Sequence, residues 1–366
     1  MKKFLSLVAI SVIGIIFGYH ISKYFFEGHD ILSGNEEIKE EKVSPIKERN
    51  SHYSYFNKGE LYADIGYGKE IAELSGQKIY GGIVPHHLFA LKDISNFFLN
   101  LKDRNINTIV IVGPNHEEKG RGDILVSQYD YKTPWGLVNP DMSKVDILIK
   151  SGFVYEDEEI FKTEHSISSL VSYIKFYLPE TNIVPIIVKS KAKDKDLDKL
   201  SGLLDRILGE NDVVLASVDF SHYLNRFGAQ FHDDKSISAI ANFNFDTLKK
   251  IEVDSPNSLR VLLKYLERRG AMKMSHYKNT NSALYSSFLD YENVTSYLFS
   301  FFTKGSSLSD ESISFISFGD AMFDRGIRKV MENDKDMFSL LRGEEGKFLK
   351  GYDFGILNLE GPITTS

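Results

Sequence analysis

The chain contains no cysteine among its 366 residues. This absence excludes disulfide bonds, thiolate metal ligands and cysteine nucleophiles. A bound metal ion would have to be held by histidine, aspartate, glutamate or backbone oxygen atoms. The ten histidines are therefore the first residues to place.

An excess of positive charge is also lacking. The chain has 44 basic and 51 acidic residues and a net charge of −7. No cluster of Lys and Arg supplies the basic face that a duplex-binding protein needs, so nucleic acid is not an expected partner. Hydrophobic residues make up 42% and charged residues 26%, which is ordinary for a globular protein with two or three domains.

Long hydrophobic runs are scarce, and the one at the N-terminus stands out. Two lysines precede an apolar segment that, counted through Ile21, reaches the lower limit of a membrane span, roughly 17–25 residues. Aromatic residues follow it where a signal peptide would carry small ones, so residues 1–27 are predicted to be an uncleaved anchor. The N-terminus would be cytoplasmic and the rest extracytoplasmic on a single-pass cell-membrane protein. A cleaved signal, giving a secreted protein, and a buried core helix are the alternatives.

Residues 28–60 are poor in large apolar side chains and mix charges of both signs, which predicts a polar stalk. Beyond it, short apolar runs alternate with segments of helical periodicity. Strands are expected at 78–84, 108–112, 183–188 and 212–218, and helices at 88–101, 166–178 and 194–208. This alternation predicts an α/β fold, with a central, mostly parallel sheet covered by helices on both faces.

Histidines follow three of the predicted strands. His86 and His87 come after the first strand, His116 after the second and His222 after the last. Parallel strands bring their carboxyl ends to one edge, where ligands bind in such sheets. Converging imidazoles there indicate a metal site or a polar catalytic site. The alternative is that each histidine only bonds to a loop backbone.

Two further residues are candidates for catalysis together with His222. His165 opens the helix predicted at 166–178, with Thr163 as a plausible N-cap, and either enters the site or faces solvent. Asp219, at the end of a strand, either orients a histidine or forms a turn with its own backbone.

Five short motifs, found in order along residues 78–303, resemble the Memo-like family, which includes the AmmeMemoRadiSam system protein B. They are Pro85-His86, Gly113-Pro114-Asn115-His116, Thr133-Pro134-Trp135-Gly136, Glu164-His165-Ser166 and Asp219-Phe220-Ser221-His222. The resemblance implies a Memo-like domain over residues 61–304. It also implies a fold similar to the class III extradiol dioxygenases, which hold non-haem Fe(II) with two histidines and a carboxylate.

The resemblance assigns His86 and His116 to the metal. The family's third ligand is a cysteine, and Asp254 stands at the matching position here. A carboxylate suits harder ions than a thiolate does, so a divalent transition metal is expected, iron first, with zinc, manganese or copper as alternatives. Asp254 could also serve as the N-cap of the following helix. His87 is an additional ligand candidate or a turn residue.

The C-terminal part contains a second pair of motifs. After a linker at 305–311, the segments 319–326 and 352–362 resemble the start of capsule-synthesis (CapA-like) proteins, which are similar in fold to metallophosphoesterases. Asp320 would be a metal ligand in that comparison. The later histidine motifs are absent before Ser366, so residues 312–366 are predicted to be a truncated, partial second α/β domain. An extension of the first domain is the alternative.

Three functions are compatible with this pattern. The first is a membrane-tethered, extracytoplasmic metal-binding protein, with oxidoreductase chemistry related to the non-haem dioxygenases, in which His222 or His165 moves protons. The second is a non-catalytic module that binds a small molecule or a peptide. The third is a role in cell-envelope polysaccharide metabolism through metallophosphoesterase-like chemistry beyond Ser366.

Overall fold

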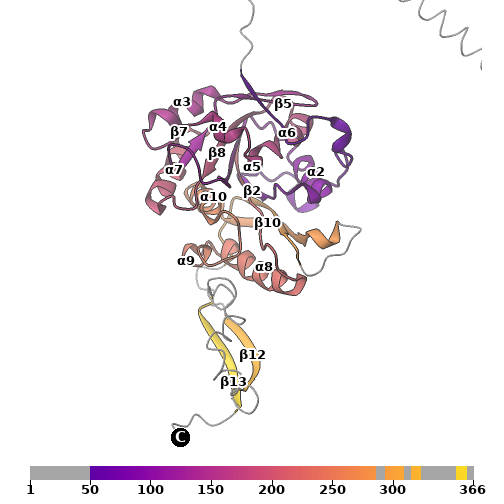
Figure 1. The fold of residues 1–366 in the computed structure, drawn as a ribbon, viewed down its shortest axis with the longest axis vertical. Helices are drawn as coiled ribbons and strands as arrows, with labels where there is room; N and C mark the ends of the chain where they lie inside the picture. Colours follow the sequence, from indigo (N-terminus) through magenta and orange to yellow (C-terminus); the bar gives the residue numbers. More distant parts are fainter. Residues whose placement is uncertain (1–49, 286–292, 309–314, 323–351, 361–366) are drawn as a thin grey trace, which may run out of the picture. The chain divides into compact units, whose positions relative to one another are not determined.

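A computed structural model describes residues 50–285, 293–308, 315–322 and 352–360 (Figure 1). Its centre is an eight-stranded sheet with the strand order β10-β11-β2-β9-β3-β8-β4-β7. In that order the strands are β10 (Lys273–Asn281), β11 (Ser296–Thr303), β2 (Gly81–Val84), β9 (Asp212–Ser217), β3 (Thr108–Pro114), β8 (Asn182–Val188), β4 (Ile124–Val126) and β7 (Tyr155–Glu156).

The four middle strands, β2, β9, β3 and β8, pair in parallel. The strands that flank them run antiparallel, because β11 pairs with β2 and β4 pairs with β8 in that sense. The predicted α/β class is confirmed, and the sheet is mixed, with its parallel part at the centre. The prediction worked for the middle strands because a strand buried on both faces is an almost continuous apolar run, as β3 is.

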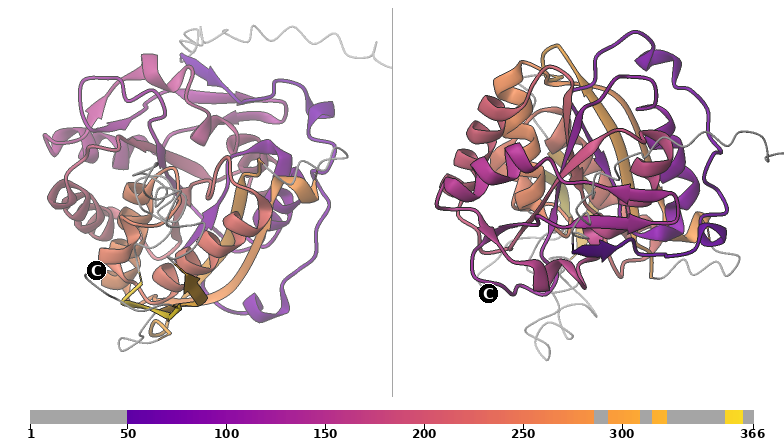
Figure 2. Two further views of the ribbon diagram at one scale, coloured as in Figure 1. Left: turned by 60° about the horizontal axis from the view of Figure 1, so that its bottom comes forward. Right: turned by 90° about the horizontal axis from the view of Figure 1, so that it is seen from above.

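Helices cover both faces of the sheet (Figure 2). Val110 and Val112 of β3 pack with α3, α7 and α10, whereas Ile109 and Ile111 of the same strand pack with α2 and α6. This alternation is the period of two that a strand imposes on its side chains. The helices are α2 (Leu91–Leu99), α3 (Met142–Lys150), α4 (Glu158–Phe161), α5 (His165–Ser168), α6 (Val171–Tyr177), α7 (Asp194–Ile207), α8 (Arg226–Ala241), α9 (Phe245–Leu248) and α10 (Pro256–Arg269).

The helix predicted at 166–178 is divided into α5 and α6. Its cap differs from the expected Thr163, because Glu164 is the N-cap and its side chain accepts a hydrogen bond from the backbone N–H of Ser166. Thr163 instead donates its hydroxyl proton to Glu117. The N-terminus of α5 therefore brings a carboxylate, Glu164, to the edge of the sheet beside His165.

Asp141, the N-cap of α3, carries a prediction about stability. Burial would raise the pKa of Asp141, but hydrogen bonds from Lys144, Ser143 and Thr108 outweigh burial and hold that pKa at about 2, below its ordinary 3.8. Because the pKa of Asp141 is lower in the folded than in the unfolded state, the ionised carboxylate stabilises the fold at pH values above the unfolded-state pKa. This stabilisation is lost as the pH falls through the folded-state pKa. Asp141→Asn should thus lower the free energy of unfolding by about 2 kcal/mol at pH 7. Urea titrations at pH 7 and near pH 2 check this, because the difference from wild type should shrink to a small fraction at the lower pH, where the carboxyl is about half protonated.

A smaller sheet joins β1 (Ser51–Tyr53), β5 (Asp130–Thr133) and β6 (Gly136–Val138). Within it β1 pairs with β5 in parallel, and the imidazole Nε2 of His52 lies 2.6 Å from Oε2 of Glu158. The described end of the predicted stalk, residues 50–60, is thus folded against the domain. The polar composition of this segment did not indicate a strand, because the buried side chain of β1 is a histidine. The carboxylate of Glu158 compensates for the burial of His52.

Near the C-terminus, β12 (Phe315–Met322) and β13 (Phe354–Glu360) form a two-stranded parallel sheet. The register places Asp320 opposite Asn358 and Met322 opposite Glu360. The segment between these strands, where a helix was expected, lies outside the described residues. Two parallel strands agree with an α/β unit in this part of the chain, while its assignment to a CapA-like domain stays a prediction.

The predicted membrane location needs correction. Across residues 50–285 and the shorter described segments, no helix has the length and apolar character to cross a bilayer. Residues 1–27, on which the anchor prediction was based, lie outside the described residues. An apolar segment close to the lower length limit was weak support from the start, and the prediction of a single-pass membrane protein is withdrawn.

Candidate metal centre

His86 is the first residue to consider, since it is almost completely buried just beyond β2. Its Nδ1 lies 3.2 Å from the hydroxyl oxygen of Ser217, at the end of β9. That hydroxyl donates its single proton to the backbone oxygen of Ser166, 2.6 Å away, so it can only accept from His86. The proton of the neutral imidazole is thereby assigned to Nδ1, and Nε2 presents a lone pair.

His116, two residues beyond β3, is oriented in the same way by a carboxylate. Its Nδ1 lies 2.8 Å from Oε1 of Glu164, and its backbone N–H donates to Oε2 of the same carboxylate over 2.9 Å. Burial would raise the pKa of Glu164, but the hydrogen bonds from His116 and from the backbone lower that pKa to about 2. An ionised Glu164 keeps the proton of His116 on Nδ1 and leaves Nε2 free.

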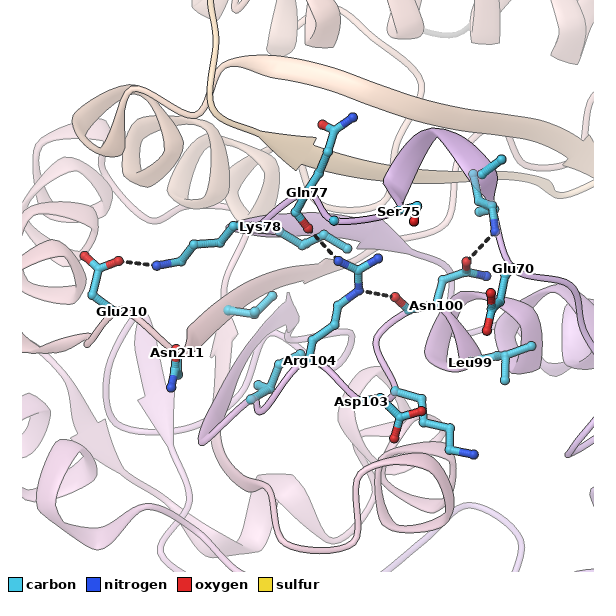
Figure 3. Close-up of a pocket in the computed structure, with 17 residues that line it drawn as sticks. Glu70, Ser75, Gln77, Lys78, Leu99, Asn100, Asp103, Arg104, Glu210 and Asn211 are labelled. Carbon is cyan, nitrogen blue, oxygen red and sulfur yellow. Dashed lines mark hydrogen bonds and ion pairs between the residues drawn. The ribbon is translucent and has the colours of Figure 1, made fainter.

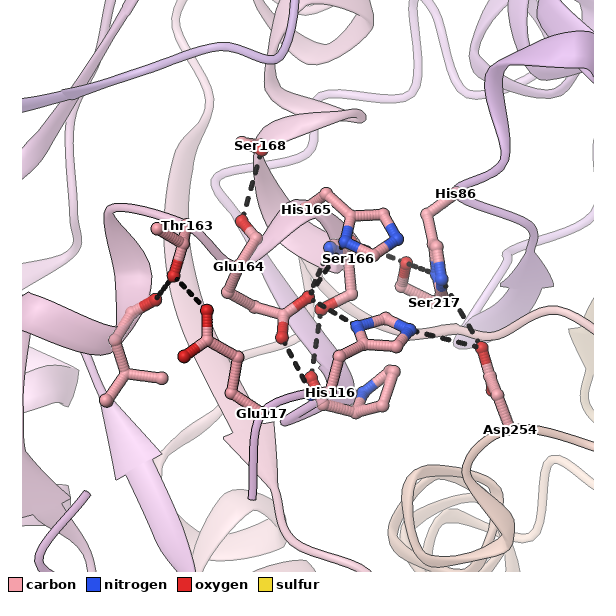
Figure 4. Close-up of polar contacts among 12 residues, drawn as sticks. His86, His116, Glu117, Thr163, Glu164, His165, Ser166, Ser168, Ser217 and Asp254 are labelled. Carbon is pink, nitrogen blue, oxygen red and sulfur yellow. Dashed lines mark hydrogen bonds and ion pairs between the residues drawn. The ribbon is translucent and has the colours of Figure 1, made fainter. Parts of the chain in front are cut away.

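The two Nε2 atoms converge on Asp254, which lies just before α10 (Figure 4). Oδ2 of Asp254 is 3.3 Å from Nε2 of His86 and 4.0 Å from Nε2 of His116. The N-cap of α10 is Ser255, which accepts from the backbone N–H of Ser258. Asp254 is therefore not the cap, and its carboxylate is directed to the histidines.

Asp219 completes the cluster from the end of β9. Its Oδ1 accepts from the backbone N–H groups of His86 and His87, and its Oδ2 lies 3.4 Å from Nε2 of His86. Its own backbone N–H donates to Oδ2 of Asp254 over 3.0 Å. Its carboxylate thus bonds to the loop after β2 rather than to its own turn.

This arrangement fits a cation. Burial, and next the charge of Asp219, raise the pKa of Asp254 well above its ordinary value, and burial likewise raises the pKa of Asp219. Oδ1 of Asp254 is buried without a hydrogen-bond partner. Among the described residues, no lysine or arginine forms an ion pair with Asp219, Asp254 or Glu164. Imidazole lone pairs that face carboxylate oxygens repel them unless a proton or a metal ion lies between.

Within the described part of the chain, two sets of three residues have donor atoms within 4.8 Å of one another. One joins His86, Asp219 and Asp254, and the other joins His86, His116 and His165. Imidazole nitrogen and carboxylate oxygen together suit iron, zinc and manganese. The residues present therefore fit a divalent transition ion.

His165, whose position the sequence left open, belongs to this cluster. Its ring stacks on that of His116 with the centroids 4.2 Å apart and meets His86 edge-on at 5.1 Å. Burial, and then the charge of His116, lower the pKa of His165. Its side chain is 38% exposed, so one side of the ring faces the cluster and another is open to solvent.

His222 and His87 lie beside the cluster and outside both three-residue sets. Burial lowers the pKa of the half-buried His222, and the charges of Asp219, His87 and His116 also act on it. Nδ1 of His87 is hydrogen bonded to the hydroxyl of Tyr297, on β11, over 2.7 Å. The structure gives His87 this partner rather than a place among the metal donors.

A cleft of about 820 Å³ lies at the opposite edge of the sheet, where β2, β9 and β3 begin (Figure 3). Its Arg104 donates to three backbone oxygens, those of Leu74, Gln77 and Asn100. Lys78 pairs with Glu210. These two cations therefore already have protein partners.

Sequence reasoning missed the residues that orient the two histidines. Ser217 was treated as part of a strand, and Glu164 was quoted in a motif without a role. The sequence did offer one indication for Glu164, its position just before a helix. An acidic N-cap can bond to the helix and also to a neighbouring side chain, as Glu164 does with His116. No local pattern indicates that Ser217 faces His86, since the contact joins residues far apart in the chain.

The bond between His116 and Glu164 leads to a prediction. Glu164→Gln keeps the size of the side chain but removes the charge that orients the imidazole. Affinity for a divalent metal should fall about 10- to 100-fold, the range for loss of a partner that orients a ligand. Competition titration with a chromophoric chelator measures this, with Glu159→Gln, on the exposed side of α4, as the matched control. Equal affinities for wild type and Glu164→Gln would contradict the assigned role.

Together these features define an α/β protein with a histidine–carboxylate cluster at the carboxyl edge of its parallel strands. A family model described as Memo-like protein matches residues 63–295. The chain belongs to the Memo-like family, and the resemblance drawn from the five motifs is confirmed.

Curated relatives agree with this membership. The chain is 28% identical over 188 residues to a MEMO1 family protein of Pyrobaculum arsenaticum. This match covers 49% of this chain and 67% of that protein. It is 29% identical over 177 residues to a MEMO1 family protein of Methanosarcina mazei, covering 47% and 65%. A MEMO1 family protein of Pyrobaculum aerophilum matches over 234 residues at 25% identity, covering 60% and 83%. The first two matches span about two thirds of those relatives.

A solved structure, that of the uncharacterized protein JW3007 from Escherichia coli K12, has a TM-score of 0.36 and 13% identity, and the match covers 60% of this chain and 99% of that one. The narrower assignment to AmmeMemoRadiSam system protein B stays a prediction.

Proposed function

We propose that the chain is a metal-dependent Memo-like protein in which His86, His116 and Asp254 hold one divalent transition ion. The observation that carries this proposal is the convergence of two Nε2 lone pairs on one carboxylate, with both Nδ1 atoms held by other residues. A metal-binding histidine typically has its other ring nitrogen bonded in this manner.

The donor set favours iron, with zinc, manganese and copper as alternatives. Two imidazoles and one carboxylate leave coordination positions open for a ligand. Asp219 lies close enough to add a second carboxylate, which would shift the preference further toward hard ions. The family cysteine would have favoured softer ions at the same position.

The proposed activity is oxidoreductase chemistry related to the non-haem dioxygenases. A bound ion would act as a Lewis acid and orient an oxygen-bearing small molecule. His165 and His222 would accept and return protons, since burial lowers the pKa of each below its ordinary value and keeps the neutral base available near pH 7.

Elemental analysis of the purified full chain tests the proposal. We expect about one equivalent of iron, zinc, manganese or copper per chain, either as purified or after reconstitution of the chelated protein. If none of the four metals binds above background, the proposal fails.

A second candidate is ligand binding without turnover. Three exposed aromatic side chains, those of Tyr55, Phe89 and Tyr223, lie against the rings of His165, His87 and His222 respectively. Such a rim could bind the apolar part of a small molecule or a peptide. Thermal-shift screening with and without a chelator separates the two candidates, because stabilisation that does not depend on metal favours simple binding.

A further inference from the structure

The turn that follows β9 brings Asp219 and His222 to the metal centre. Its backbone is anchored on the first residues of β11, since Phe220 donates to the backbone oxygen of Ser296 and Ser296 donates back to that of Ser221, each over 2.9 Å. Leu224 forms an isolated bridge with Val294 two residues earlier on the same segment. The turn therefore has a fixed base and projects His222 and Tyr223 from it.

The tip of this turn departs from the usual backbone geometry. Tyr223 has a φ of 56°, in the left-handed region that residues other than glycine rarely adopt. Its side chain is 83% exposed, so packing of Tyr223 does little to hold this conformation. Contacts below the turn must maintain it.

Asp233, on α8, provides such contacts. It is 3% exposed and accepts hydrogen bonds from three elements. Its Oδ1 accepts from the hydroxyls of Ser221, over 3.0 Å, and Ser296, over 2.6 Å, and its Oδ2 accepts from the amide of Asn279 on β10, over 2.8 Å. One carboxylate thus ties the turn after β9 to β11 and β10.

Burying a carboxylate at this position costs free energy. Burial raises the pKa of Asp233 to about 6 in spite of the three hydrogen bonds, so its ionised form is less favourable here than in water. Apolar side chains of similar volume often stabilise such positions better. Stability alone does not account for a carboxylate here, and its three hydrogen bonds point to a role in fixing geometry.

We propose that Asp233 is a positioning residue for the metal centre, which holds the turn carrying Asp219 and His222 in register with His86 and Asp254. This inference rests on the proposed metal function. The connection is short, because Ser221 adjoins His222 and lies two residues from Asp219. Asp219 in turn donates to Asp254 and accepts from the backbone of His86, so a displaced turn disturbs donors on both sides of the site.

The test compares variants of the full chain. Asp233→Ala removes all three hydrogen bonds, and Asp233→Asn retains an acceptor for the two hydroxyls. Asp234→Asn is the matched control, since Asp234 is the exposed neighbour of Asp233 on α8 and accepts a hydrogen bond from the amide of Gln230. Leu204→Ala, in the core at α7, controls for a general loss of stability.

Two readouts separate positioning from stability. The first is the ring signals of His222 in NMR spectra of histidine-labelled protein, assigned with His222→Gln. The second is zinc affinity, measured by competition on samples shown to be folded by circular dichroism. Asp233→Ala should shift the His222 signals and weaken zinc binding about tenfold. Asp233→Asn should recover most of the affinity, and Asp234→Asn and Leu204→Ala should change neither readout.

Wild-type His222 signals and zinc affinity in a folded Asp233→Ala variant would overturn the inference. If Asp233→Ala does not fold, Ser221→Ala replaces it, since it removes one hydrogen bond and should change both readouts in the same direction by a smaller amount. A wild-type chain that binds none of iron, zinc, manganese and copper would defeat the proposed function instead, and the His222 signals would still report whether Asp233 holds the turn.

Discussion

Replacing both His86 and His116 by alanine is expected to abolish transition-metal binding. The variant loses the two Nε2 donors that face Asp254, and the remaining carboxylates and His165 form a weak site for these ions. Metal content should fall from about one equivalent per chain to background. Inductively coupled plasma mass spectrometry after reconstitution and desalting measures this directly.

The matched control is His276→Ala, a histidine on β10 that belongs to neither set of candidate donors. It should retain the metal content of the wild type. A double variant that still binds one equivalent would remove the basis for the proposed centre, whatever the behaviour of the control.

Replacing Asp254 by cysteine is expected to change which metal the site selects. The carboxylate favours iron and manganese, whereas a thiolate at the same point favours zinc and copper(I). The ratio of zinc affinity to manganese affinity should rise at least about tenfold relative to the wild type. Competition titrations with both ions measure the ratio, which is independent of small losses in total affinity.

Asp254→Asn is the companion variant, because it keeps the shape of the side chain and removes its charge. It should bind both ions more weakly without favouring zinc. An unchanged ratio in Asp254→Cys would show that residue 254 is not a ligand, and the assignment based on its contacts with His86 and His116 would then be wrong.

Much of the fold could be predicted from local patterns. The central strands are short apolar runs buried on both faces, and the helices between them carry apolar residues at helical spacing, so β3, β8, β9 and α7 appear close to their expected bounds. Because parallel strands share one carboxyl edge, His86 and His116 could also be expected to meet. This inference required no knowledge of the strand order.

The rest depended on contacts between distant residues. Nothing near His165 in the chain indicates that its ring stacks on His116, and nothing near Ser217 indicates that its hydroxyl fixes the tautomer of His86. The antiparallel strands β10 and β11 were not predicted, since β10 has no clear alternation of apolar and polar residues. Its place in the sheet is set by pairing with the apolar β11.

The strand order also determines when the site can exist. β9 lies between β2 and β3 although it comes much later in the chain, and Asp254 follows later still. A nascent chain synthesised only past His116 would contain both imidazoles. It would lack β9, the strand that lies between β2 and β3 and fixes the positions of the two histidines. Such a nascent chain would capture metal poorly, so loading should come after synthesis of the domain through α10 and serve as a late marker of its maturation.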